Sequence, residues 1–352
     1  MWMEGSTSGV YRMWFQHMDI NRISFYQYNT IIVGTGAAGL NAAVTLHKLG
    51  QKNIALIIRD RYMGTSRNTG SDKQTYYKLT QCGSEPDSVR KMAETLFDGG
   101  CVDGDIAMAE AAGSLRAFYH LVDIGVPFPF NKSGEYVGYK TDHDPLKRGI
   151  SAGPLTSKYM TECLERQAEE RGIPFFDGYQ AVRLLTEEKN GEKWAAGIIA
   201  LNKQKAASPD ERYAVFSAVN IIWATGGEAG MYQASVYPVS QTGGMGVLLE
   251  AGAVAKNLTE SQFGIASVKY RWNLSGTFQQ CLPRYLSAEQ DGSHEREFLN
   301  DYFDTPRQLL TAIFLKGYQW PFDPRKVEGQ GSSLIDLLVY QETVLKLSLI
   351  HI

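Results

Sequence analysis

Short apolar runs separated by longer mixed stretches recur through the first two thirds of the chain. Residues 29–33 (Asn-Thr-Ile-Ile-Val) and residues 54–58 have the length and apolar character of buried strands. Between them we predict a helix over residues 37–49, and Gly50 is placed to end it in a left-handed conformation. A strand, a helix and a strand in this order predict a βαβ unit with parallel strands, and so an α/β fold.

The pattern predicts further elements up to about residue 252. Asn190-Gly191 signals a tight hairpin between two of the strands. The loops 60–72 and 128–153 show no clear period, and we expect function to concentrate there. Near Phe263 the alternation of predicted strands and helices stops, and we place a domain boundary there. The predicted helices are 86–97 (with Pro86 in its first turn), 105–122, 155–170 and 246–251, and the predicted strands are 173–176, 181–186, 194–201 and 219–223.

Length and charge narrow the class of protein. The chain has 352 residues, and domains commonly hold about 100–200, so we expect two domains. The formal net charge is −3, which leaves no basic excess for binding nucleic acid. No apolar run approaches the ~20 residues of a membrane span, and residues 1–27 lack the apolar centre of a secretory signal, so we expect a cytoplasmic protein.

Cysteine and histidine spacing gives no metal signature. The 4 cysteines lie far apart, which argues against a disulfide framework or a zinc site. His143 stands between acids in residues 140–144, but a single histidine among alternating acids fits a metal poorly. We therefore predict no metal site.

A glycine motif joins the first strand to the first helix. Gly34, Gly36 and Gly39 form Gly-x-Gly-x-x-Gly. The first glycine permits the tight turn, the second lets the backbone approach a pyrophosphate, and the third lets the helix pack on the strand. The helix N-terminus then offers free N–H groups to the phosphates. Asp60, the only acid near the end of the second strand, either binds the ribose or is a solvated loop acid.

Three further motifs decide which dinucleotide is expected. Ala224-Thr225-Gly226-Gly227 follows a buried strand, Thr242-Gly243 leads to Glu250-Ala251-Gly252-Ala253, and residues 64–71 form a loop rich in Ser, Thr and Gly. Together with the glycine turn, they make residues 29–302 resemble the FAD-dependent fumarate reductase, succinate dehydrogenase and L-aspartate oxidase family. The later motifs weigh against an NAD-dependent dehydrogenase.

The resemblance implies a domain organisation and a cofactor site. It implies a Rossmann-type FAD-binding domain with a parallel sheet (29–262) and an incomplete α+β substrate-capping domain (263–352), which follow a leader (1–28) of irregular sequence. In one branch of the family a histidine of the 64–71 loop bonds covalently to the flavin; Asn68 stands at or next to its place, so we expect non-covalent FAD. The positions that match the family's FAD contacts are Gly34, Gly36, Ala37, Ala38, Gly39, Asp60, Ser66, Asn68, Thr69, Gly70, Ala181, Ala224, Thr225, Gly226, Thr242 and Gly243.

The chain departs from the family where substrate is bound. Residues 262–265 read Gln-Phe-Gly-Ile where the family has Gln-Phe-His-Pro, and residues 242–245 read Thr-Gly-Gly-Met where it has Thr-Gly-Asp-Gly. In the segment that resembles the proton-donor segment, Glu297 stands where arginine is expected. The remaining candidates for anion capture and catalysis are Arg271, Arg284 and Arg296, with the stretch His143, Lys147 and Arg148 as a further possibility.

Two functions from different classes remain. The first is an FAD-dependent oxidoreductase that transfers hydride through flavin N5 to or from a small organic acid or related compound. The second is a non-catalytic flavin-binding subunit or fragment that works with a partner, such as an electron-transfer subunit. Residues 303–352 still resemble the capping domain in sequence, so we expect a partial chain.

Overall fold

The computed structural model describes residues 20–352 except 70–73, 101, 142–143, 228–231, 233–234, 239, 242, 257–263, 268, 270–271, 275–276 and 320–321. Its described residues fall into two compact units. The first unit is drawn from Met1–Thr69, Leu121–Val126 and Ser157–Lys256, and the second from Gly70–His120, Pro127–Thr156 and Asn257–Ile352. Phe263 lies outside the described residues, and the division into leader, FAD-binding and capping domains stays a prediction.

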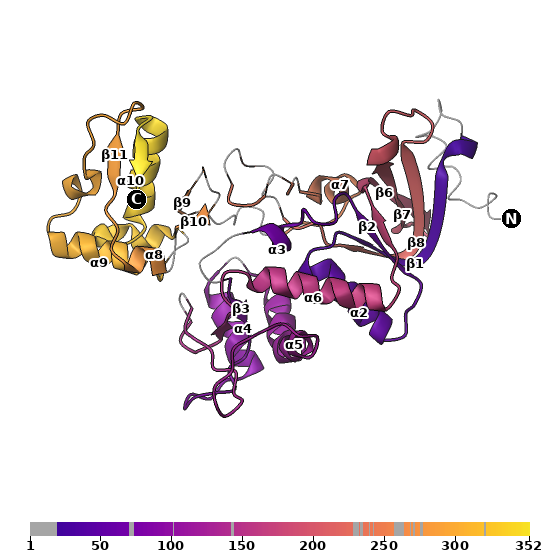
Figure 1. Ribbon diagram of the computed structural model, residues 1–352, viewed down its shortest axis with the longest axis horizontal. Coiled ribbons are helices and arrows are strands. Elements are labelled where there is room, and N and C mark those ends of the chain that lie inside the picture. Colours follow the sequence, from indigo (N-terminus) through magenta and orange to yellow (C-terminus); the bar gives the residue numbers. More distant parts are fainter. Residues whose placement is uncertain are drawn as a thin grey trace. The chain divides into compact units, whose positions relative to one another are not determined.

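A six-stranded sheet forms the centre of the first unit, in the order β5-β2-β1-β8-β7-β6 (Figure 1). The first four strands of this order run parallel, while β7 runs antiparallel to both of its neighbours. The mainly parallel sheet confirms the predicted α/β fold. The strands are β1 (Ser24–Val33), β2 (Ile54–Ile58), β5 (Phe175–Asp177), β6 (Tyr179–Lys189), β7 (Glu192–Asn202) and β8 (Tyr213–Trp223).

The βαβ unit forms where the sequence predicts it. All five residues of β2 are buried, as its apolar run requires. Helix α2 (Ala37–Lys48) packs on β1, β2 and β8, and Gly50 follows it with a φ of +99°. Strand β1 starts at Ser24, five residues before the predicted start. The sequence did not show this because Tyr26 and Tyr28 alternate with polar residues; their rings pack against the sheet core.

The other elements of the first unit lie close to where the sequence predicts them, with two differences: β8 starts at Tyr213, six residues before the predicted start, and a short helix lies within the predicted loop 60–72. The hairpin of β6 and β7 turns at Asn190 and Gly191, both with positive φ, as the Asn-Gly pair predicts. The helices of this unit are α3 (Thr65–Asn68), α6 (Thr156–Glu170, which starts one residue inside the second unit) and α7 (Met245–Glu250).

The second unit has a helical core and a polar cluster in its earlier part. It contains α4 (Val89–Asp98), most of α5 (Gly104–Asp123) and the short pair β3 (Tyr76–Tyr77) and β4 (Gly149–Ile150). Helix α4 begins three residues later than predicted, and Pro86 lies outside it. The cap is Ser88, whose hydroxyl accepts a hydrogen bond from the Lys91 N–H at 3.1 Å.

The later part of the second unit has its own hydrophobic core, which includes Phe298, Ile313 and Ile335. Within it, Lys316 forms a buried ion pair with Asp336. Among the described residues, no helix has the length and hydropathy needed to cross a membrane. The elements are β9 (Ala266–Ser267), β10 (Trp272–Asn273), α8 (Thr277–Gln280), β11 (Leu286–Ala288), α9 (Pro306–Lys316), α10 (Leu334–Tyr340), the π-helix η7 (Gln341–Leu345) and β12 (Leu349–His351).

Candidate FAD site

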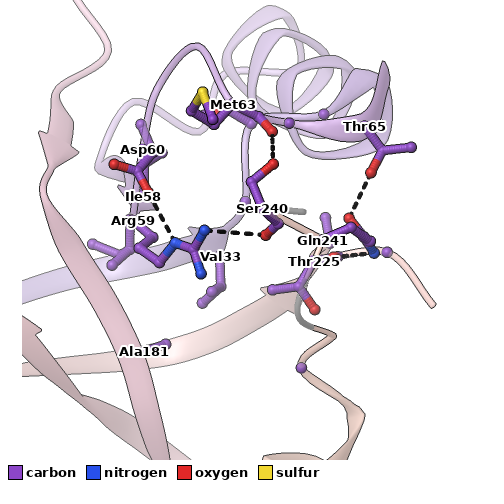
Figure 2. Close-up of a pocket in the computed structure, with 18 of the residues that line it drawn as sticks. Val33, Ile58, Arg59, Asp60, Met63, Thr65, Ala181, Thr225, Ser240 and Gln241 are labelled. Carbon is purple, nitrogen blue, oxygen red and sulfur yellow. Dashed lines mark hydrogen bonds and ion pairs between the residues drawn. The ribbon is translucent and has the colours of Figure 1, made fainter. Parts of the chain in front are cut away.

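A pocket of about 480 Å³ opens in the first unit at the carboxyl ends of β1, β2 and β8 (Figure 2). This is the end of a parallel sheet at which α/β proteins bind nucleotides. The helix α2 begins at its wall. Among the sequence-predicted positions, those that line the pocket are Gly34, Gly36, Ala37, Ala38, Asp60, Ser66, Ala181, Ala224, Thr225, Gly226 and Gly243.

The glycines of the first turn are required by close backbone contacts. Gly34 has a φ of +105°, and a Cβ there would lie 2.4 Å from the carbonyl oxygen of Ala224. Gly39 does not line the pocket. A Cβ at Gly39 would lie 2.1 Å from the carbonyl oxygen of Gly34, so this glycine serves the packing of helix on strand. Both close approaches are those that the motif predicts.

Gly36 shapes the anion-binding end of helix α2. It is the N-cap residue, and it contributes no side-chain cap to the helix. The Ala37 N–H donates a hydrogen bond to Ser66 Oγ at 3.1 Å, which ties α2 to the loop after β2. A helix N-terminus whose N-cap residue has no side chain, with a hydroxyl beside it, suits a pyrophosphate.

Comparison with known proteins agrees with this geometry. The family described as "FAD binding domain" matches residues 29–283, which is most of the chain. The chain belongs to this family. FAD is therefore the cofactor that the pocket of this FAD-binding domain is built for, and the open helix end and close-packed glycines fit its pyrophosphate.

The curated relatives are oxidoreductases by name. L-Aspartate oxidase of Agrobacterium fabrum is 28% identical over 242 residues, which cover 66% of this chain and 42% of the relative. The succinate dehydrogenase flavoprotein subunit of Coxiella burnetii is 24% identical over 254 residues, which cover 69% of this chain and 41% of the relative. The chain thus spans about two fifths of the length of these relatives.

Solved structures share the fold. Quinol fumarate reductase FrdA of E. coli aligns with a TM-score of 0.61 and 19% identity, covering 84% of this chain and 51% of that one. The open conformation of a flavocytochrome c3 fumarate reductase aligns with a TM-score of 0.62 and 18% identity, covering 90% and 54%. At this identity the likeness is one of fold.

The loop after β2 carries fewer pocket residues than the sequence predicts. Ser66 lines the pocket, but Asn68 and Thr69 do not. The Asn68 amide instead donates hydrogen bonds to the carbonyl oxygens of Tyr62 (2.6 Å) and Gly64 (3.0 Å), within its own loop. Gly70 and Thr242 lie outside the described residues. The flavin contacts assigned to this loop remain predictions.

Gln241 fastens the pocket rim, a role that the sequence did not reveal. Its amide nitrogen donates to the carbonyl oxygen of Thr225 at 3.2 Å, and its Oε1 accepts from Thr65 Oγ1 at 2.6 Å (Figure 2). The amide nitrogen also donates to the carbonyl oxygen of Gly227 at 3.4 Å. A Cβ on Gly226 would lie 2.3 Å from Gln241 Nε2. Gln241 therefore joins the loop after β8 to the loop after β2, and the available signal was its place just before the Thr-Gly pair.

Asp60 is ion-paired at the pocket edge. Its carboxylate binds Arg59 at 2.9 Å, and Arg59 donates to the carbonyl oxygen of Ser240 at 3.2 Å (Figure 2). The carboxylate also pairs with Lys203. Partial burial by itself would raise the pKa of Asp60, but the hydrogen bonds from Lys203 and Arg59 outweigh it and hold the pKa below its usual value. Asp60 is thus ionised at neutral pH, and its contact with the ribose stays a prediction.

The start of β6 forms one side of the pocket, where the family resemblance predicts the adenine to lie. Ala181 lines the pocket there, next to Gln180 and Tyr179. The Tyr179 hydroxyl accepts a hydrogen bond from Asn202 at 3.2 Å. Burial, together with a hydrogen bond to Tyr26, raises the pKa of Tyr179 to about 12, so the phenol stays neutral.

The predicted catalytic arginines are already engaged in ion pairs where the structure describes them. Arg284 pairs with Glu297 at 2.6 Å, and Arg296 pairs with Asp301 at 2.6 Å and with Glu342 at 3.2 Å; all belong to the second unit. Arg271 lies outside the described residues. A catalytic role for these three arginines stays a prediction.

Arg148 has a structural role in the second unit. Its side chain is fully buried and forms an ion pair with Asp87 at 2.7 Å. His143 lies outside the described residues. Within the described part of the chain, no cluster of three or more His, Cys, Asp or Glu side chains is arranged to hold a metal.

Proposed function

We propose that this chain is the FAD-binding part of an oxidoreductase that acts on a small organic acid or a related compound, with FAD held non-covalently. The observation that carries the proposal is the pocket at the N-terminus of α2, with its close-packed glycines and open helix end. When bound, FAD supplies hydride transfer at its N5 atom.

Each part of the pocket has a separate task in this proposal. The first turn of α2 and Ser66 bind the pyrophosphate through N–H groups and a hydroxyl. The start of β6, at Ala181, borders the adenine. Gln241 fixes the distance between the loops after β2 and β8 before the cofactor arrives. A preformed site of this kind lowers the ordering cost of binding.

Non-covalent attachment follows from the chemistry of the loop after β2. An asparagine amide has no nucleophilic ring nitrogen for bonding to a flavin carbon, and the Asn68 amide is engaged by two backbone carbonyls. Denaturation is therefore expected to release FAD from the protein as the unmodified cofactor.

A second function, a flavin-binding subunit without its own catalysis, is supported by the substrate-side residues. Glycine and isoleucine follow Phe263 in place of the family's His-Pro pair, and Arg284 and Arg296 are committed to ion pairs. Some structures with this fold come from complexes, such as the Mycobacterium smegmatis Sdh1 complex. In either function, the chain would work with an electron-transfer partner subunit.

The first test is a visible absorption spectrum of the purified chain after incubation with FAD and gel filtration. A retained flavin band near ~450 nm that is released on denaturation supports non-covalent FAD. The matched variants are Gly36→Val, which fills the open helix end beside Ser66, and Gly113→Ala, which meets open space on α5. We expect loss of the band in the first variant alone. Absence of the band in the native chain contradicts the proposal.

Turnover separates the two functions. With FAD bound, the chain is supplied with a reduced dye and a series of small unsaturated acids, and dye oxidation is followed. Oxidation that depends on the acid supports the oxidoreductase. Retention of FAD without any acid-dependent oxidation supports the non-catalytic subunit.

A further inference from the structure

The loop after β2 needs support from other elements to place Ser66 at the FAD pocket. The Ser66 hydroxyl lies at the N-terminus of α2, where it accepts the Ala37 N–H at 3.1 Å. Ser66 belongs to α3, which has only 4 residues. Helices shorter than roughly 12 residues are marginal by themselves in water, so contacts from elsewhere must hold Ser66 in place. One such contact, from the loop after β8, is the hydrogen bond between Thr65 and Gln241 (Figure 2).

A single carboxylate on α6 binds two arginines that flank Ser66 in this loop. Glu165 Oε1 accepts a hydrogen bond from Arg61 Nε at 2.5 Å, and Glu165 Oε2 pairs with Arg67 Nη2. The side chains of Glu165, Arg61 and Arg67 are largely buried, with exposures of 10%, 18% and 12%. Both oxygens of Glu165 are thus occupied by loop residues, and all of these residues belong to the first unit.

Each arginine also has a second contact away from the pocket. Arg67 Nη1 lies 3.5 Å from Glu162 Oε1 on α6. Arg61 also pairs with Glu169 on α6, and its guanidinium lies 4.1 Å from the centre of the Phe175 ring on β5. Neither arginine is among the residues that line the pocket. The arginines therefore fasten the loop to α6 and β5, while Ser66 between them faces the cofactor site.

We propose that Glu165 is a positioning residue for FAD, because its bridge between Arg61 and Arg67 holds the Ser66 hydroxyl where the pyrophosphate binds. The inference rests on the proposed function, since it needs FAD in this pocket. Glu165 is not among the pocket-lining residues and acts through the loop. A loop that is ordered before the cofactor arrives lowers the cost of binding.

The charge of Glu165 makes the direction of the expected effect informative. The pyrophosphate of FAD is negatively charged, so removal of a nearby carboxylate would by itself strengthen FAD binding. If the bridge positions Ser66, Glu165→Gln weakens binding instead. A glutamine amide has one acceptor oxygen where the carboxylate has two, so it cannot accept from both arginines in the same way.

The test measures FAD dissociation constants of the full chain by titration. Glu165→Gln is compared with Glu170→Gln, which removes the same charge from the same helix. Glu170 is exposed and pairs with Arg166 within α6. We expect the dissociation constant to rise about tenfold in Glu165→Gln, the usual size of one hydrogen bond, and to change less than about twofold in the control.

Repetition of the comparison in a Ser66→Ala background separates positioning from a general loss of stability. Without the Ser66 hydroxyl the bridge has no group to position, so we expect Glu165→Gln to cause no further weakening there. A loss of fold stability would weaken FAD binding in both backgrounds. Glu165→Asp keeps the charge between the arginines and shortens the side chain by one methylene. It replaces the glutamine variant if that variant does not fold, and we expect a smaller rise that again depends on Ser66.

The outcomes separate this inference from the proposed function. If the native chain binds FAD and Glu165→Gln binds it equally well, the inference is wrong and the proposed function stands. Tighter binding by Glu165→Gln also overturns the inference, and indicates that the released arginines bind the pyrophosphate. Equal weakening with and without the Ser66 hydroxyl overturns it as well. If the native chain binds no FAD, the inference and the proposed function fail together.

Discussion

Replacement of Arg148 by methionine gives the sharpest test of how the second unit is held together. Arg148, Asp87 and Asp144 have side-chain exposures of 0%, 2% and 2%. Arg148 binds both oxygens of Asp87, at 2.9 and 2.7 Å, and its Nη1 also donates to Tyr77 and Thr95 at 3.2 and 3.0 Å. Methionine keeps most of the volume but leaves two buried carboxylates without their cation.

The structure sets the size of the expected effect. Removal of one partner of a buried ion pair typically costs about 3–5 kcal/mol, because the other charge stays buried. Among the described residues, Asp87 would keep the backbone hydrogen bonds from the N–H groups of Thr80 and Ser88, at 3.0 and 2.8 Å. Burial by itself would raise the pKa of Asp87, and Arg148 is the main group that holds it below its usual value. The variant is therefore expected to take up a proton as well.

Native-state hydrogen exchange of α4 is the suitable assay, because Asp87 accepts the Ser88 N–H at the start of this helix. With about 1.4 kcal/mol for each factor of ten, we expect the exchange of protected α4 amides to accelerate by about 10²- to 10⁴-fold. Arg90→Met is the matched control. Arg90 lies on the same helix, but its side chain is 83% exposed and pairs with the exposed Glu94, so its loss is expected to cost at most about 0.5 kcal/mol.

If Arg148→Met accelerates exchange less than about tenfold, or no more than Arg90→Met does, Arg148 does not stabilise this unit as described. Arg148→Lys gives a graded check. Lysine keeps the positive charge but cannot make the bidentate hydrogen bonds to Asp87, so we expect an intermediate acceleration of amide exchange.

Three further predictions concern the glycine turn after β1, the buried ion pair of Lys316 and Asp336, and the ion pair of Asp60 and Lys203 at the pocket edge. Gly34→Ala places a Cβ 2.4 Å from a backbone oxygen at a φ of +105°, so we expect FAD affinity to fall at least 100-fold in a binding titration, against no change in Gly113→Ala. Burial raises the pKa of Asp336 to about 6, despite the opposing effect of Lys316. Because the ordinary value in an unfolded chain is about 3.9, the folded chain holds this proton more tightly; its contribution to stability is present below about pH 4 and is lost as the pH rises through 6. Denaturant midpoints between pH 4 and 7 should show this decline in the native chain and a flatter profile in Asp336→Asn; equal slopes would contradict it. Lys203→Ala removes a half-exposed partner of Asp60, so the pKa of this carboxyl, followed by NMR, should rise while stability changes by less than about 1 kcal/mol; an unchanged pKa would show that Arg59 alone sets it.

Local sequence patterns determined most of the fold. Residues 54–58 can only be stable when buried, and the glycines at 34, 36 and 39 leave room that the backbone contacts then use. These features depend on neighbours along the chain, on steric limits at single residues and on apolar character, which is why they were readable from the sequence. The family match at residues 29–283 agrees with the cofactor that these patterns indicate.

Only the tertiary structure decided which polar side chains face the pocket. Asn68 and Ser66 look equivalent in the sequence, yet one binds its own loop and the other lies at the helix end. Gln241 lies far along the chain from the loop after β2, and its hydrogen bond to Thr65 exists because folding brings the two loops together at the pocket. The partner of a polar side chain is set by the atoms that folding brings near it, and the strength of that contact depends on burial, so neither can be read from a residue's neighbours in the chain.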